Sequence, residues 1–218
     1  MIRATDLTFS YDGAPQTMRF PHIECKTGGK LLILGDSGSG KTTLLHLLCG
    51  LLRPKTGEIL VSGLGVNSLG DRQLDQFRGR ELGMVFQQAH FVQSLTVSEN
   101  LALPSLLTKD NISSTDLANR TQELLTRLRL DHKSDSLPKD LSVGEQQRAS
   151  IARALIHKPS VVFADEPTSA LDDRSTEAVI QLLEEETQLA GASLVVVTHD
   201  SRLKSRYSDR VELQNIAQ

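Results

Sequence analysis

The sequence has no tryptophan, few aromatic residues and only two cysteines. Cys25 and Cys49 match no metal-binding or redox spacing, and both lie in apolar stretches, which excludes a disulfide-rich scaffold and predicts buried thiols. No apolar run reaches the roughly 18 residues that a membrane-spanning helix needs. The N-terminal stretch MIRATDLTFSY also lacks the apolar block of a signal peptide. We therefore expect a cytoplasmic chain with no direct membrane insertion, which reaches a membrane only by docking on another protein.

An excess of either charge is also missing. The 24 Lys+Arg residues face 27 Asp+Glu residues, for a formal net charge of −3. Nucleic-acid binding relies on a basic patch, so we expect no nucleic-acid partner. The 218 residues, of which 39% are hydrophobic, fit one globular domain with room for an inserted lobe.

Three short apolar runs predict buried strands: KLLIL (30–34), VVFA (161–164) and SLVVVT (193–198). Each adjoins a helical pattern, as expected of a mostly parallel sheet that is covered on both faces. Leu7, Phe9 and Tyr11 alternate with polar residues instead, which predicts an antiparallel strand with one solvated face. The leucines between 44 and 52 predict an apolar helix after the first run. These patterns indicate an α/β core.

The segment from about 91 to 156 carries few strand signals. Thr96 and Glu99 form a capping box, which predicts that a helix begins there. Helical spacing relates the leucines at 117, 124, 125 and 128. We therefore predict an α-helical lobe inserted into the α/β core.

A phosphate-binding motif follows the first buried strand. GDSGSGKTT (35–43) satisfies G-x-x-x-x-G-K-[ST] between a strand and a helix, the context that this motif requires. The alternative, an ordinary glycine-rich turn, is disfavoured by that context. Backbone N–H groups would surround the phosphates at the positive helix end, with Lys41 on the β and γ phosphates and the Thr42 hydroxyl on Mg²⁺. The residues assigned to ATP in this loop are Gly35, Asp36, Ser37, Gly38, Ser39, Gly40, Lys41, Thr42 and Thr43.

Two further strand ends carry candidate catalytic residues. VVFADEP (161–167) delivers Asp165 to the carboxyl edge of the sheet as a second metal ligand. Glu166 follows, placed to orient or deprotonate the attacking water. A solvated acidic turn is the alternative, and the phosphate loop makes it less attractive. His199 ends the third apolar run; a histidine there is usually structural, but here it is a candidate donor to the γ-phosphate.

The stretch LSVGEQQR (141–148) raises a separate question. Ser142 and Glu145 form a capping box, so a helix should begin here. Gly144 would then occupy the first helical turn, although glycine costs about 1 kcal/mol against alanine inside a helix. A cap alone does not explain that glycine.

With these motifs in hand, the sequence resembles the nucleotide-binding subunits of ABC transporters over essentially the whole chain. The motifs occur in the family's order: 35–42, VFQQ (85–88) with Gln87, LSVGEQQR (141–148), VVFADEP (161–167), SALD (169–172) and His199. The resemblance implies one domain, 1–218, with the fold of a P-loop NTPase. A RecA-like core and an N-terminal antiparallel β subdomain would comprise about 1–90 and 157–218, and the helical subdomain about 91–156.

The resemblance also implies that two copies face each other head to tail and enclose two ATP molecules. Gly144 would then leave space for the γ-phosphate bound by the other copy. The ATP contacts implied outside the phosphate loop are Tyr11, which stacks on adenine, Ser142, Gly144, Glu145 and Asp172. The implied catalytic residues are Glu166, His199 and Gln87, and the implied Mg²⁺ ligands are Thr42, Gln87 and Asp165. The sequence departs from the commonest signature at Val143 and Glu145, where the family has Gly and Gln.

Segments 75–88 and 94–101 resemble one subgroup, the lipoprotein-release, macrolide-efflux and cell-division ATPases. The implied partner is an integral membrane permease subunit, which would hold the chain on the inner face of the cell membrane. Phe91, Val92 and Leu95 would form part of the groove for a short cytoplasmic helix of that partner; alternatively, they pack the helical lobe.

The function expected is ATP hydrolysis that drives a membrane partner, by efflux or by mechanical transmission. The alternative is an ATP-driven regulatory clamp that controls an extracytoplasmic enzyme and moves no cargo. DNA-repair and chromosome-structuring ATPases insert coiled coils or zinc modules between the motif halves. Here only about 55 residues, without heptads or cysteine pairs, separate Gln87 from Ser142. A tandem translation-type ATPase would need a second phosphate loop, and the sequence contains only one, so this class is disfavoured.

Overall fold

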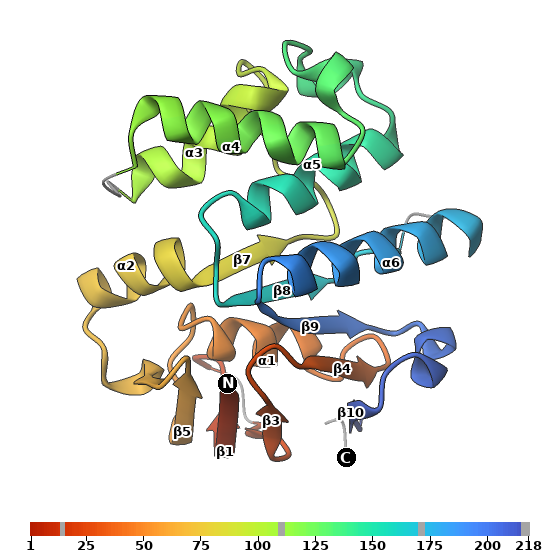
Figure 1. Ribbon diagram of the computed structural model, residues 1–218. Coiled ribbons are helices and arrows are strands. Elements are labelled where there is room, and N and C mark those ends of the chain that lie inside the picture. The colour runs from red at the N-terminus through yellow and green to blue at the C-terminus, as the bar shows by residue number, and fades with distance from the viewer. Residues whose placement is uncertain (14–15, 109–111, 170–172, 215–218) are drawn as a thin grey trace.

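The computed structural model describes residues 1–13, 16–108, 112–169 and 173–214 (Figure 1). Its strands are β1 (Ile2–Phe9), β2 (Met18–Arg19), β3 (Ile23–Cys25), β4 (Lys30–Gly35), β5 (Thr56–Val61), β6 (Leu64–Gly65), β7 (Leu82–Val85), β8 (Val161–Asp165), β9 (Ser193–Thr198) and β10 (Asp209–Leu213). Its α-helices are α1 (Lys41–Leu48), α2 (Asp71–Glu81), α3 (Val97–Leu107), α4 (Ser114–Arg127), α5 (Val143–Leu155) and α6 (Asp173–Leu189). The fold is the predicted α/β fold of a P-loop NTPase.

A parallel sheet of five strands, in the order β10-β4-β9-β8-β7, forms the centre of the molecule. The three predicted apolar runs are its inner strands β4, β9 and β8. Side chains alternate between two cores: Ile33 and Phe163 pack with α1, while Leu32 and Val162 pack on the side of α5 and α6. Because both faces are covered, the inner positions of these strands, 31–34, 161–164 and 194–197, are all apolar.

The second sheet is antiparallel and contains β1 at its centre, paired with β2, β3 and β5. This confirms the antiparallel strand near the N-terminus. The strand ends at Phe9, however, so Tyr11 lies beyond it and not within it as predicted. In Figure 1 this sheet lies below the parallel sheet, on the side of α1.

Helix α1 is shorter than predicted. It ends at Leu48, and Leu51 is 50% exposed. Gly50 has φ 67°, and the N–H of Leu51 returns to the carbonyl of His46. Such a left-handed glycine satisfies the last carbonyls of a helix and ends it, although the apolar pattern continues.

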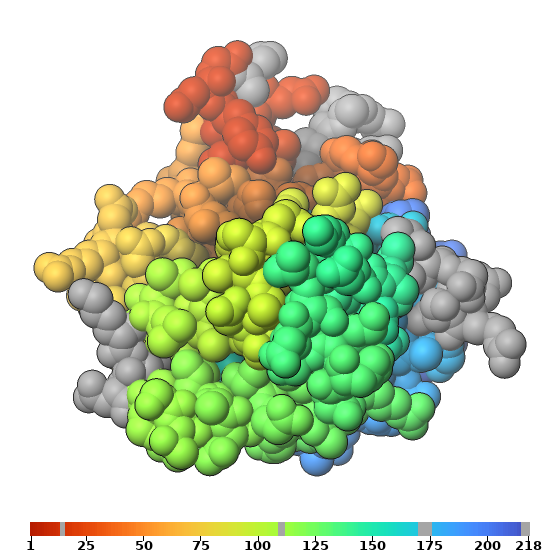
Figure 2. Space-filling model, turned by 90° about the horizontal axis from the view of Figure 1, so that it is seen from above, coloured from red at the N-terminus to blue at the C-terminus, as the bar shows by residue number. Residues whose placement is uncertain are grey.

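Helices α3, α4 and the first part of α5 lie above the parallel sheet, and the green segment dominates the near face in Figure 2. Thr96 and Ser142 begin α3 and α5 with the predicted capping boxes. Between 91 and 156, the described residues include no strand. We propose that a helical subdomain extends from about 91 to about 156. Across the described parts of the chain, no helix has the length and hydropathy of a membrane span.

Candidate active site

The β4–α1 loop forms a cradle for an anion. Gly40, the residue before α1, has φ 87°, and no side chain caps the first N–H groups of the helix. Gly38 has φ 83°, and a Cβ there would meet nothing within 4 Å. Left-handed backbone of this kind turns successive N–H groups toward one point. The loop and the open helix start therefore present donors to a phosphate group.

Lys41 is buried, and its ammonium group lies across this loop. Nζ donates to the carbonyls of Gly35 at 2.8 Å and of Asp36 at 3.0 Å. It also lies 3.6 Å from Oε1 of Glu166. The loop's own carbonyls thus hold the positive charge in the position from which it would meet a phosphate.

Ser39 packs beneath the loop with 1% of its surface exposed. A Cβ on Gly35 would collide with its hydroxyl oxygen. Close packing of the loop on itself therefore requires a glycine at 35. The Thr42 residue, in contrast, is exposed at the start of α1.

Asp165 ends β8 at the carboxyl edge of the parallel sheet. Burial, and then the neighbouring Glu166, raise the pKa of its carboxyl group, against the opposing effects of His46 and Lys41. Its Oδ1 is buried and has no hydrogen-bond partner among the described residues. A buried carboxylate oxygen without a partner, together with an exposed threonine hydroxyl on α1, is a donor set suited to Mg²⁺.

No group of three or more His, Cys, Asp or Glu side chains in the described ranges forms a metal cluster. Magnesium is commonly bound by one or two carboxylates together with water and substrate phosphates. A cation beside Asp165 would also reverse the effect of burial and keep the carboxylate ionised.

Glu166 occupies a constrained turn directly after β8. It has φ 46°, and its N–H donates to the carbonyl of Val197 at 2.8 Å. Its Oε2 accepts from the hydroxyl of Thr198 at 2.9 Å and from the backbone N–H of His199 at 3.3 Å. Such left-handed backbone at a non-glycine residue is costly and is typical of functional sites.

His199 completes this group at the end of β9. Its Nδ1 lies 3.0 Å from Oε2 of Glu166, and its side chain is 60% exposed. The phosphate-loop lysine, the two carboxylates and the histidine therefore converge on one edge of the sheet. The arrangement can hold a triphosphate and place a base beside it.

Gln87 follows β7, the neighbour of β8. The register pairs Val85 with Ala164, so Gln87 and Glu166 lie at equal distances along the chain beyond this pair. Gln87 is exposed and lines a hollow of about 530 Å³ together with Val92, Val143 and Gln147. Strand pairing thus brings Gln87 to the same edge as the acidic residues.

Tyr11 lies on the phosphate-loop side of the antiparallel sheet. Its hydroxyl forms a hydrogen bond of 2.9 Å with Oγ1 of Thr43, and its ring packs edge-on against Phe9. The side chain remains 46% exposed and is therefore accessible to a flat ligand. Asp172, the other predicted contact, lies outside the described residues.

The helix start at Ser142 is on a different element, among the helices above the sheet (Figure 1). The Ser142 N–H and hydroxyl each donate to Oε2 of Glu145 at 2.8 Å. These bonds, the backbone one first, hold the pKa of Glu145 below its usual range. A Cβ on Gly144 would meet only Nη1 of Arg148, at an ordinary 3.6 Å. No contact among the described residues therefore requires glycine at 144.

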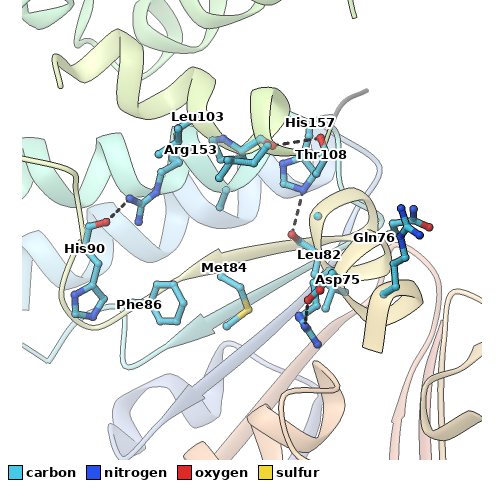
Figure 3. A pocket seen from close by; sticks show the side chains of 16 residues that line it. Asp75, Gln76, Leu82, Met84, Phe86, His90, Leu103, Thr108, Arg153 and His157 are labelled. Atoms are coloured by element: carbon cyan, nitrogen blue, oxygen red, sulfur yellow. Dashed lines mark hydrogen bonds and ion pairs between the residues drawn. The ribbon is translucent and has the colours of Figure 1, made fainter. Parts of the chain in front are cut away.

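A groove of about 800 Å³ opens between α2, β7, α3 and the end of α5 (Figure 3). Across it, Arg153 donates to the carbonyl of His90, and Nε2 of His157 pairs with the carbonyl of Leu82. Its lining includes Phe86 and not the predicted Phe91, Val92 and Leu95. Phe91 is buried in the core of the helical segment, with the Arg153 guanidinium over its ring. For Phe91 the packing interpretation is therefore correct.

The sequence motifs did not predict a role for two polar side chains of this region. Thr198 holds the Glu166 carboxylate, and Gln147 donates to the carbonyl of Pro167 at 2.9 Å. Both are buried, and both bridge segments that are distant in sequence. The only signal of Thr198 is its position before His199 at a strand end.

The comparisons with known proteins agree on one family. Residues 21–169 match the family described as ABC transporter. The lipoprotein-releasing system ATP-binding protein LolD of Syntrophotalea carbinolica is 40% identical over 206 residues, which are 93% of this chain and 90% of that protein.

Solved structures of similar shape are ATP-binding cassettes. The dimeric post-hydrolysis state of MJ0796, bound to ADP and Pi, has a TM-score of 0.86 and 32% identity, covering 99% of this chain and 95% of that one. CbiO1 from Clostridium perfringens, part of the ABC transporter complex cbiONQ, has a TM-score of 0.83 and 25% identity, covering 91% and 78%. The chain therefore belongs to the ABC transporter family and is an ATP-binding, ATP-hydrolysing subunit of such a transporter.

Proposed function

We propose that two copies of this chain close head to tail over two ATP molecules, each held between one copy's phosphate loop and the other's Ser142 helix start. Gly144 carries this proposal, because the part of its own chain that the structure describes gives no reason for a glycine there. Ser142 and Val143 are exposed at the positive end of α5, free to face a second molecule. The dimeric form of the structurally similar MJ0796 supports the arrangement.

Within each site, the residues that converge at the sheet edge divide the work. Lys41 would leave its loop carbonyls for the phosphates, and this frees Glu166 to accept a proton from the attacking water. His199, beside that carboxylate, would donate to the phosphoryl group. Asp165, Thr42 and Gln87 would hold Mg²⁺, which supplies positive charge to the phosphates. Tyr11 would stack on adenine, and Asp172 of one copy would cross to the other.

Gly144→Asp tests the composite site. The variant should bind ATP as a monomer with wild-type affinity, because the phosphate loop is untouched. It should fail to dimerise, because the aspartate would face the γ-phosphate across the interface and repel it. ATP titration and light scattering in the presence of ATP measure the two properties separately.

Gly191→Asp provides a control glycine, since a Cβ there meets nothing within 4 Å, although its φ of 69° adds backbone strain. That control should still dimerise. Loss of monomeric ATP binding in Gly144→Asp would contradict the two-copy site.

We further propose that the groove of Figure 3 receives a short cytoplasmic segment of an integral membrane permease subunit. Apolar side chains form much of its wall, among them Leu103, Leu107 and Phe86. Leu107 is 72% exposed, which is unusual for leucine and leaves an apolar surface to cover. The similarity to the ATP-binding protein of a lipoprotein-releasing system supports a membrane partner of the lipoprotein-release subgroup. The chain would thereby sit on the inner face of the cell membrane.

Leu107→Asp should weaken recovery of the membrane partner, because it places a charge in the apolar wall of the groove. Because Leu107 is exposed, the change should leave the fold intact. Leu189→Asp is a matched control: it alters an equally exposed leucine, 71%, at the end of α6 and outside the groove. Affinity purification from membranes, followed by mass spectrometry, compares the two. Equal recovery of the same membrane protein with both variants would count against the groove.

A further inference from the structure

One side chain joins the helix that begins at Ser142 to the turn that carries Glu166. Gln147 lies on α5, three residues after Gly144, and is only 6% exposed. Its Nε2 donates to the backbone carbonyl of Pro167 at 2.9 Å, across twenty positions of sequence. The side chain therefore ties the first turns of α5 to the residue that follows the proposed base.

The turn that it contacts is strained and needs support. Glu166 has φ 46°, and it precedes a proline, which restricts its backbone further. Backbone bonds fix two points: the N–H of Glu166 donates to Val197, and the N–H of Ser169 donates to the carbonyl of Glu166. Pro167 has no N–H and is buried, so its carbonyl is the backbone atom through which a further hydrogen bond can restrain this peptide. Gln147 supplies that donor.

The two ends of this link act on different nucleotides. If two copies enclose two ATP molecules, as proposed above, the start of α5 contacts the ATP held by the other copy. Glu166 acts on the ATP of its own copy. We propose that Gln147 is a positioning residue for Glu166 and couples the geometry of the two ATP sites. It holds the Glu166–Pro167 turn in the position set by the helix that meets the other nucleotide.

Gln147→Ala and Gln147→Glu test this role in the full chain. Each should lower kcat for ATP hydrolysis by about tenfold, the scale of one buried hydrogen bond, and leave KM within about twofold. The glutamate keeps the shape of the side chain and removes the donor, so shape alone cannot rescue it. Coupling also predicts that the Hill coefficient for ATP, at most two for two sites, moves toward one.

A double variant separates positioning from general support of the fold. If Gln147 acts through Glu166, then Gln147→Ala should add almost no loss of rate in a Glu166→Gln background. A purely structural role would lower the rate by the same factor in both backgrounds. Multiplicative losses would therefore overturn the proposal, as would a wild-type kcat in folded Gln147 variants.

Gln146→Ala is the matched control on the same helix. Gln146 donates to the carbonyls of Pro138 and Leu141, which belong to the helical segment and not to the Glu166 turn. Its loss should change kcat by less than about twofold, since no bond to the base's turn is removed. An equal loss in both variants would assign the effect to the helix as a whole and overturn the positioning role. A Glu166→Gln chain that stays monomeric with ATP would instead defeat the two-copy arrangement alone.

Discussion

Glu166→Gln is expected to bind ATP normally and to hydrolyse it at least about a hundredfold more slowly, the scale of a lost general base. The amide keeps the size of the carboxylate, and its oxygen can still accept from Thr198 and from the N–H of His199. It cannot take a proton from water. Because closure over ATP needs no hydrolysis, the variant should accumulate as a dimer with two trapped nucleotides.

Phosphate release and light scattering with Mg-ATP measure these two effects on one preparation. Glu185→Gln makes the same chemical change on an exposed residue of α6, and it should retain the wild-type rate and remain largely monomeric. Wild-type turnover in Glu166→Gln would remove Glu166 from its role. A slow variant that never forms a dimer would keep the base and reject the two-copy site.

The inner strands were predictable because their surroundings are uniform. Between two covered faces the inner side chains of β4, β8 and β9 are buried, so these strands appear in the sequence as continuous apolar runs. β10 carries exposed charged residues and is a strand through its pairing with β4. β5 is half exposed, and β7 follows α2 with no intervening turn. β10, β5 and β7 pair with β4, β1 and β8, which are distant in the chain, and no local pattern predicts these pairings.

The site residues also divide into those that the local sequence predicts and those that it does not. The phosphate loop and the capping box at Ser142 are local chemistry, in which glycine and serine at fixed spacing determine the backbone. Contacts between segments that are distant in the chain have no such local sequence pattern. Thr198 meets Glu166, and Gln147 meets Pro167, only because neighbouring elements pack together. The groove shows the same limit: Phe86 lines it while Phe91 is buried, although both are aromatic residues of one stretch.

Lys41→Ala should abolish measurable ATP binding. Lys41 is the cation that the loop holds in place, 8% exposed and bonded to two loop carbonyls. Asp165 and Glu166 lie at the same sheet edge, so a triphosphate entering without the lysine would meet two carboxylates and no compensating side-chain charge. Unit charges about 4 Å apart near a protein surface interact by about 4 kcal/mol, which corresponds to roughly a thousandfold in affinity.

Calorimetric titration with ATP tests this expectation, and Lys139→Ala, which removes an exposed lysine of the helical segment, should bind as the wild type does. Loop N–H groups survive in Lys41→Ala, so the comparison separates the point charge from the backbone cradle. Affinity within about tenfold of the wild type, equivalent to about 1.4 kcal/mol, would show that the N–H groups neutralise the phosphates without the lysine. The ammonium would then serve the folded loop through its bonds to Gly35 and Asp36, and the thermal stability of the nucleotide-free chain, not its affinity, would fall.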